Sequence, residues 1–135
     1  MLPAKRILSL TLILVLTSLS GCTTPFLTLP GRALQGEPAI TDSFAFARQY
    51  KLLQLEVNPS SPYSVWLRTT LIGNDLYIDA APSRRWHSQL QSDNRVRIKL
   101  GEKIYPATAI ITASKDITRQ FLAGRIIYRI EPTGL

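Results

Sequence analysis

The chain has 135 residues, 45% of them hydrophobic, and a formal net charge of +7 at pH 7. This length suits one domain with a modest core and is too short for two. A single cysteine and a single histidine exclude an internal disulfide and fall short of a metal-ligand set.

The first residues have the build of an export signal. Lys5 and Arg6 form a basic start, and an apolar run follows over 7–19. A helix that crosses the ~30 Å hydrocarbon core of a bilayer needs about 20 apolar residues. The shorter run therefore predicts a cleaved signal peptide over residues 1–21 rather than a permanent anchor.

The signal ends in Leu19-Ser20-Gly21-Cys22, which resembles the lipobox of bacterial lipoproteins. The resemblance implies a diacylglycerol on the sulfur of Cys22, cleavage before this residue, and acylation of the new amino terminus, for example with palmitate. Several acyl chains hold a protein stably at a membrane, whereas one binds only marginally. Thr23, in place of an aspartate, implies the outer membrane and a domain that faces the periplasm. The alternative is a signal peptide without lipidation.

Cleavage removes the two positive charges of Lys5 and Arg6 and lowers the formal charge from +7 to +5. A basic exported chain suits anionic lipid headgroups, envelope polymers or a phosphate-bearing ligand, whereas export argues against nucleic acid. Residues 22–40, rich in Pro, Thr and Gly, are predicted to be the lipidated cysteine and a flexible tether. Residues 41–135 are predicted to be the folded domain.

The domain is expected to open with a helical turn capped by Thr41 or Asp42. Apolar residues then alternate with Gln54 and Glu56 over 51–57. This period predicts a strand with its apolar side chains on one face and the two polar side chains on the other.

A hairpin is expected next, after a turn over 58–62 that is rich in proline. The aromatic and β-branched stretch 63–72 is joined by Gly73-Asn74-Asp75 to the segment 76–80. These signals predict two antiparallel strands.

A short helix is predicted over 84–92, with Ser83 as its N-cap. Trp86 and Leu90 are spaced i and i+4, so they should share the buried face. The helix is expected to end at Asp93-Asn94.

The segment 95–100 has the cleanest strand period, and its cations Arg95, Arg97 and Lys99 are interpreted as a solvated face; a basic groove for lipid or polymer is the alternative. The strand 103–112 follows, in which Pro106 predicts an edge or a bulge.

The last elements are a second short helix and a closing strand. Ser114 is expected to cap the helix, Ile117 and Phe121 to form its buried face, and Gly124 to follow its end. The strand is expected over 125–130. Short strands on a chain of this size bury an apolar face by curling, so the predicted fold is mostly β, a small antiparallel barrel of about six strands with two short helices.

This order of elements resembles the flavin-binding split-barrel superfamily, which includes pyridoxamine phosphate oxidase-like and deazaflavin-dependent nitroreductase-like proteins. The matching stretches are LRTTLIGNDLYIDAAPSRRWHSQLQSDNRVRIKLGEKIYPATA at 67–109 and IYRIEP at 127–132. Within them, the family's helix and strand motifs correspond to Ser83-Arg84-Arg85-Trp86, Leu90 and Asp93-Asn94-Arg95-Val96.

The resemblance implies a flavin such as FMN, with its phosphate near the hairpin and the start of the helix, and it allows a homodimer. The residues implied in cofactor binding are Arg68, Thr70, Ser83, Arg84, Arg85 and Trp86. Helix N-terminal amides and guanidinium groups suit an anion. Trp86 is interpreted first as a plug that docks the helix on the barrel, and otherwise as a ring-stacking contact.

No catalytic or metal set is predicted. His87 has no visible nucleophile or second histidine beside it and is interpreted as a surface residue. The carboxylates are scattered, although Asp79 is expected to pair with Arg68 across the hairpin.

The sequence thus predicts a lipid-anchored envelope protein that binds an anionic ligand or a protein partner without a cofactor and without chemistry. The alternative is a flavin-dependent oxidoreductase or flavin carrier. A third hypothesis is a structural lipoprotein that supports an envelope assembly through its basic face.

Overall fold

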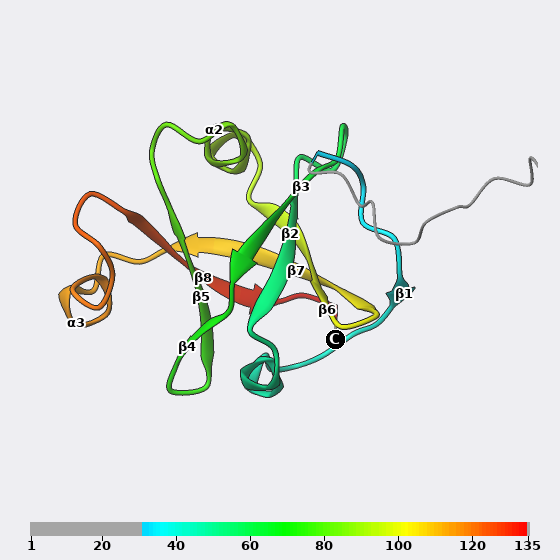
Figure 1. The fold of residues 1–135 in the computed structure, drawn as a ribbon, viewed down its shortest axis with the longest axis horizontal. Helices are drawn as coiled ribbons and strands as arrows, with labels where there is room; N and C mark the ends of the chain where they lie inside the picture. The colour runs from blue at the N-terminus through cyan, green and yellow to red at the C-terminus, as the bar shows by residue number, and fades with distance from the viewer. Residues whose placement is uncertain (1–30, 135) are drawn as a thin grey trace, which may run out of the picture.

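The structure, a computed structural model, describes residues 31–134 and is built mainly of antiparallel strands (Figure 1). Its elements in chain order are β1 (Glu37–Pro38), the 3₁₀ helix η2 (Ala45–Gln49), β2 (Leu52–Val57), β3 (Tyr63–Arg68), β4 (Thr70–Ile72), β5 (Asp75–Ala80), α2 (Arg85–Ser92), β6 (Arg95–Leu100), β7 (Lys103–Ile111), α3 (Lys115–Thr118) and β8 (Ile126–Pro132). Cys22 and the signal lie outside the described residues. No helix within 31–134 has the length and apolar character that crossing a membrane requires.

The strands form one sheet in the order β3-β2-β6-β7-β8-β5-β4. β3 and β4 are two parts of one bent segment, separated by Thr69, and they pair with β2 and β5 at the two ends of this order. The sheet therefore curls until a single chain segment joins its ends. This confirms the predicted small antiparallel barrel of about six strands with two short helices.

The barrel is open along one side, where β3 and β5 separate. Only Thr70–Ile72 pairs with β5, through the Thr70↔Tyr77 to Ile72↔Asp75 register. β3 instead follows β2 along its whole length, from Leu52↔Arg68 to Val57↔Tyr63. The expected hairpin is thus confirmed near its turn and wrong beyond it, because the chain bends at Thr69 and takes β3 away from β5.

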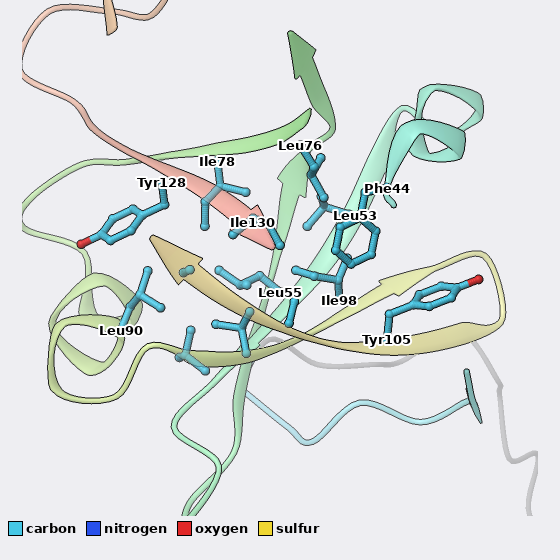
Figure 2. Packing of buried hydrophobic residues seen from close by; sticks show 14 of the residues in the cluster. Phe44, Leu53, Leu55, Leu76, Ile78, Leu90, Ile98, Tyr105, Tyr128 and Ile130 are labelled. Carbon is cyan, nitrogen blue, oxygen red and sulfur yellow. The ribbon is translucent and has the colours of Figure 1, made fainter. Parts of the chain in front are cut away.

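The core fills the barrel interior. Figure 2 shows Leu55, Ile78, Ile98 and Ile130 converging there, and these residues belong to β2, β5, β6 and β8. In β6 the buried and less buried positions alternate strictly, as predicted. Full burial of one such aliphatic side chain contributes about 1.5–3 kcal/mol, so the core is the main source of stability.

α2 closes one end of the barrel. Trp86 and Leu90 are 6% and 1% exposed and belong to the core cluster. Figure 1 shows the helix above the end of the sheet at which β3 begins. The spacing of these two apolar residues predicted this buried face correctly.

The described part of the predicted tether, residues 31–40, lies against the barrel. Leu34 is 4% exposed, its N–H donates to the Glu56 carboxylate over 2.8 Å, and β1 pairs in parallel with the start of β7. Gln54 and Glu56 are consequently 3% and 4% exposed. The strand and its two faces are as predicted, but both faces are buried, because a strand period separates two faces and does not reveal a segment that covers the second.

Pro106 lies inside a central strand, so the expected edge or bulge is wrong. β7 pairs with β1 at Lys103 and Ile104 and with β8 from Ala107 onward, and Pro106 falls between the two ladders. Its carbonyl accepts from the N–H of Thr133 over 3.1 Å. Because the N and C=O of one residue point to the same side of a strand, the missing N–H costs no bond to β6.

The second predicted helix is a single turn. Ser114 is its N-cap residue, as expected, although its side chain makes no capping hydrogen bond, and α3 has no buried residue. Ile117 and Phe121 are only half-buried, because one turn presents too few side chains to form a core face.

The turn before β2 is present but starts differently from the prediction. The hydroxyl of Ser43 accepts from the N–H of Ala45 over 3.1 Å at the start of η2. Thr41 bonds only to Ser43, and no side chain caps the helix at its formal N-cap. The expected cap at Thr41 or Asp42 is therefore wrong by one or two residues.

Candidate functional site

The predicted phosphate-binding residues Ser83, Arg84 and Arg85 are exposed where the chain enters α2. The N-cap is Arg84, and it makes no side-chain bond to the helix. The expected N-cap at Ser83 is wrong because the Arg84 N–H bonds back to the Ala81 carbonyl over 3.1 Å, a turn that delays the helix. The first turn holds no acidic residue, so free amides and two guanidinium groups meet at this end, which favours an anion.

Arg85 is fixed on the barrel by an aromatic ring. The carbon of its guanidinium lies 5.0 Å from the ring centroid of Tyr63, the first residue of β3. This is the geometry of a cation–π contact. Because the guanidinium N–H donors lie in the plane of the group, stacking on a ring leaves them available to a ligand.

Gly31, the first residue that the structure describes, also lies beside the start of β3. The N–H of Gly31 donates to the Ser64 carbonyl over 2.9 Å, and the Ser64 hydroxyl donates to the Arg32 carbonyl. Gly31 has φ +101°, and a Cβ there would come within 3.0 Å of the Tyr63 ring, so only glycine allows this approach. Arg32 thus lies beside the start of β3. We call the surface formed by Arg32, Tyr63, Arg84 and Arg85 the Tyr63 face.

The cations of the Tyr63 face have no acidic partner within residues 31–134, a range that contains all nine acidic residues of the chain. The ion pairs of this range join other arginines to carboxylates: Arg95–Asp93, Arg97–Glu56, Arg119–Asp116, Arg125–Asp79 and Arg129–Glu131. The Tyr63 face is therefore a surface of uncompensated positive charge.

Arg68 and Thr70, implied in the same phosphate site, lie elsewhere. Arg68 ends β3, about 17 Å from Tyr63 at ~3.3 Å per residue. Side chains alternate along a strand, so Arg68 points outward with Trp66, whereas Tyr63 packs toward the core. A flavin phosphate that needs Arg68 and Arg85 together does not fit this arrangement.

The expected ion pair between Asp79 and Arg68 is wrong. Asp79 lies 3.7 Å from Arg125 instead. The reason is the bend at Thr69, which takes β3 away from β5 before Arg68 comes opposite Asp79.

Trp86 and His87 are interior residues. Trp86 is in the core cluster, which agrees with its interpretation as a plug. His87 is 1% exposed, with its Nε2 atom 2.9 Å from the Tyr128 hydroxyl and its Nδ1 atom buried without a partner. Burial raises the pKa of the Tyr128 phenol, which thus stays protonated at neutral pH.

The expected surface position of His87 is therefore wrong. His87 follows Trp86 directly and precedes Leu90 by three residues, so it lies on the same helical stripe. This spacing was the signal that could have identified it as buried.

The cations of β6 are bound within the fold, which corrects the expected solvated face. Arg97 donates to both carboxylate oxygens of Glu56, at 2.6 and 2.7 Å, and these bonds raise the pKa of its guanidinium. Lys99 donates to the Gln35 carbonyl over 2.5 Å. Only Arg95 keeps an open position, and its side-chain hydrogen bond lowers the pKa of Asp93 to about 2.

A groove of about 470 Å³ lies over this row, and its lining includes Pro59, Pro62, Arg95, Arg97, Pro106 and Thr108. Both arginines are already paired, so the groove offers no free charge to an anion. No group of His, Cys, Asp or Glu side chains within 31–134 could hold a metal ion.

Comparison with known proteins gives no match to a family model or to a curated protein sequence. Solved structures do match. A Listeria innocua protein named for pyridoxamine 5′-phosphate oxidase has a TM-score of 0.57 at 13% identity, over 67% of this chain and 90% of that one. A FAD-binding protein from Mesorhizobium loti gives 0.52 at 13%, over 65% and 85%.

The heme storage protein of Vibrio cholerae also matches, with a TM-score of 0.51 at 13% identity, over 67% of this chain and 87% of that one. Identities this low show the fold alone. The observed barrel and these likenesses together establish that the chain has the split β-barrel fold that its sequence pattern implied.

Proposed function

We propose that this protein is a lipid-anchored envelope protein whose split barrel binds an anionic ligand or partner at the Tyr63 face without doing chemistry. One observation carries the proposal: Arg85 lies over the Tyr63 ring, Arg84 precedes it at the N-cap of α2, Arg32 lies beside the start of β3, and within the described residues none of the three has a carboxylate partner. The lipid anchor is inferred from Leu19-Ser20-Gly21-Cys22.

The state of the other reactive side chains supports binding rather than catalysis. The imidazole of His87 is enclosed, and the carboxylates of Glu56, Asp79 and Asp93 are held in ion pairs. General acid–base catalysis needs a group that can reach a substrate. Within the described residues, none of these four side chains forms an ion pair with an arginine of the Tyr63 face.

The test is to measure by calorimetry how tightly the Cys22→Ser protein binds an inorganic polyphosphate. We expect Arg84→Ala/Arg85→Ala to weaken binding about tenfold, because two phosphate contacts are lost. The matched control is Arg95→Ala/Arg119→Ala, which removes the same charge from arginines that are already paired. An equal loss in both variants would show that net charge alone, and no particular face, attracts the anion.

The lipid anchor has a separate test. Cys22→Ser should abolish labelling by a fatty acid and release the protein from the membrane fraction. A variant that stays membrane-bound would contradict the anchor.

A flavin-binding function is the second candidate. Similar structures include a FAD-binding protein, and the half-buried residues Tyr63, Val65 and Leu67 line the open side of the barrel. The test is the absorbance spectrum of the protein after incubation with FMN or FAD and desalting. A retained flavin spectrum that disappears in Arg84→Ala/Arg85→Ala would replace the first proposal with this one.

A further inference from the structure

We infer that the free edge of β3 is the docking site for an extended, acidic segment of a protein partner, which pairs with β3 as an added strand. This inference rests on the proposed binding role of the Tyr63 face and names the kind of partner that it binds. It concerns the backbone of β3 between Ser64 and Arg68, which we call the β3 edge.

β3 stands at one end of the strand order, so one of its edges faces no other strand. Just beyond β3, the N–H of Thr69 donates to the carbonyl of Lys51, the residue opposite it, over 3.0 Å. Hydrogen-bonded pairs alternate along an antiparallel ladder. The odd-numbered residues of β3 therefore bond to β2, and the even-numbered ones point their N–H and C=O groups away from it. The Ser64 carbonyl agrees with this direction, because it accepts from the N–H of Gly31.

The backbone groups of Trp66 and Arg68 consequently lie on the β3 edge. Within residues 31–134 no other strand and no other backbone group bonds to them on this side. Figure 1 shows β3 and β5 diverging from β4, which leaves the edge open. Proteins usually protect such an edge with a proline, a bulge or a covering segment. β3 has no proline and no break in its register with β2, so its edge offers paired donors and acceptors to an extended chain.

Apolar side chains flank the β3 edge on both faces of the strand. Val65 and Leu67 point inward and are half-buried at the opening of the barrel. Trp66 points outward and is 54% exposed. Residues that lie opposite each other on neighbouring strands pack against each other. A partner strand with apolar side chains would therefore cover three side chains that the barrel leaves in contact with water.

Cations at both ends of the β3 edge determine the charge of the partner. Arg85 stacks on Tyr63 at one end. Arg68 is exposed at the other end, about 17 Å along the strand from Tyr63 at ~3.3 Å per residue. Within residues 31–134 neither arginine has a carboxylate partner. An extended peptide of about six residues spans this length, so carboxylates near its two ends can meet both arginines.

The edge of β5 supplies a contrast. After Tyr77, β5 also has no strand beside it on the side of β4. This stretch carries no cation, and its one charged side chain, Asp79, is paired with Arg125. An acidic segment is therefore expected to select β3 and not β5.

The probe is the capped hexapeptide Glu-Val-Thr-Val-Thr-Glu, added to the Cys22→Ser protein while amide hydrogen exchange is followed by NMR. The N–H groups of Trp66 and Arg68 should exchange rapidly in the free protein and at least about tenfold more slowly with bound peptide. The N–H of Asp79 on β5 is the internal control, and its exchange should not change.

N-methylated peptides test backbone pairing in the unmodified domain. A strand directs every second N–H toward its neighbour. N-methylation at one of the two alternating sets of peptide residues should therefore weaken binding about tenfold, and at the other set less than about twofold.

A variant of the β3 edge gives a second test. Trp66→Pro should abolish peptide binding, because it removes an N–H of this edge and no bond to β2. Its matched control, Trp66→Val, keeps the N–H and should bind the peptide within about threefold of the unmodified domain.

Three results would overturn the inference. They are slow exchange of Trp66 and Arg68 in the free protein, which would show that the edge is already occupied, equal losses for all N-methylated peptides, and no binding at about 1 mM peptide. The proposed function stands in each case if polyphosphate still distinguishes Arg84→Ala/Arg85→Ala from Arg95→Ala/Arg119→Ala. Alternating losses in the peptide series without that distinction would contradict the proposed function alone.

Discussion

β6 and the Tyr63 face both carry closely spaced cations, but the two sets of cations have different partners. On β6, Arg97 is tied to Glu56 and Lys99 to the Gln35 carbonyl. On the Tyr63 face, Arg85 rests on an aromatic ring and, within the described residues, has no carboxylate partner. The first set is used to fasten the segment 31–40 to the barrel, and the second remains available to a ligand.

The difference lies in what the fold places beside each cation. Glu56 is buried on β2, directly across from Arg97 in the strand register. A buried carboxylate must be paired and hydrogen-bonded to be tolerated. Within residues 31–134 no carboxylate forms an ion pair with the cations of the Tyr63 face, so charge density by itself did not distinguish a structural cation from one that can bind.

The largest expected effect comes from Arg97→Ala. It leaves the Glu56 carboxylate buried with only the Leu34 N–H as donor, so the free energy of unfolding should fall by about 3 kcal/mol. Urea unfolding measures this change. Arg95→Ala removes an exposed pair and should cost much less, because solvent and salt screen such a pair; similar costs for both variants would contradict the distinction between the two regions.

A smaller effect of opposite sign is expected from Arg84→Asp. Arg84 occupies the N-cap of α2 without a capping bond. Aspartate is a favoured N-cap and also interacts well with the positive end of the helix dipole, so stability should rise by about 1 kcal/mol. Polyphosphate binding should fall in the same variant.

Arg84→Ala is the control for that substitution, because it removes the cation without adding a cap. It should weaken polyphosphate binding with little change in the urea midpoint. A clear loss of stability in either variant would show that Arg84 has a structural role, as Arg97 has.

The smallest effect concerns Asp93 and acid. Because Arg95 lowers the pKa of Asp93 from 3.8 to about 2, the folded state binds this proton less readily than the unfolded state. Its stabilising contribution is therefore present above about pH 4 and is lost as the pH falls through 2. Urea midpoints measured from pH 4 to pH 2 should decline less steeply in Asp93→Asn than in the unmodified protein; parallel declines would contradict the effect of this exposed pair.

The sequence determined the elements whose signal is local. The alternation in β6, the hairpin turn at Gly73 and the i, i+4 pair Trp86 and Leu90 each identify an element and its buried side. The short strands of a small chain also fix the barrel class, because an apolar face of this size must be enclosed.

Only the tertiary structure decided which faces are covered and which side chains meet. The bend at Thr69 sends β3 to β2 and separates Arg68 from Arg85. The segment 31–40 buries Glu56, and α2 carries His87 into the interior. Periodicity separates the two faces of one segment, whereas burial and pairing depend on contacts between residues far apart in the chain.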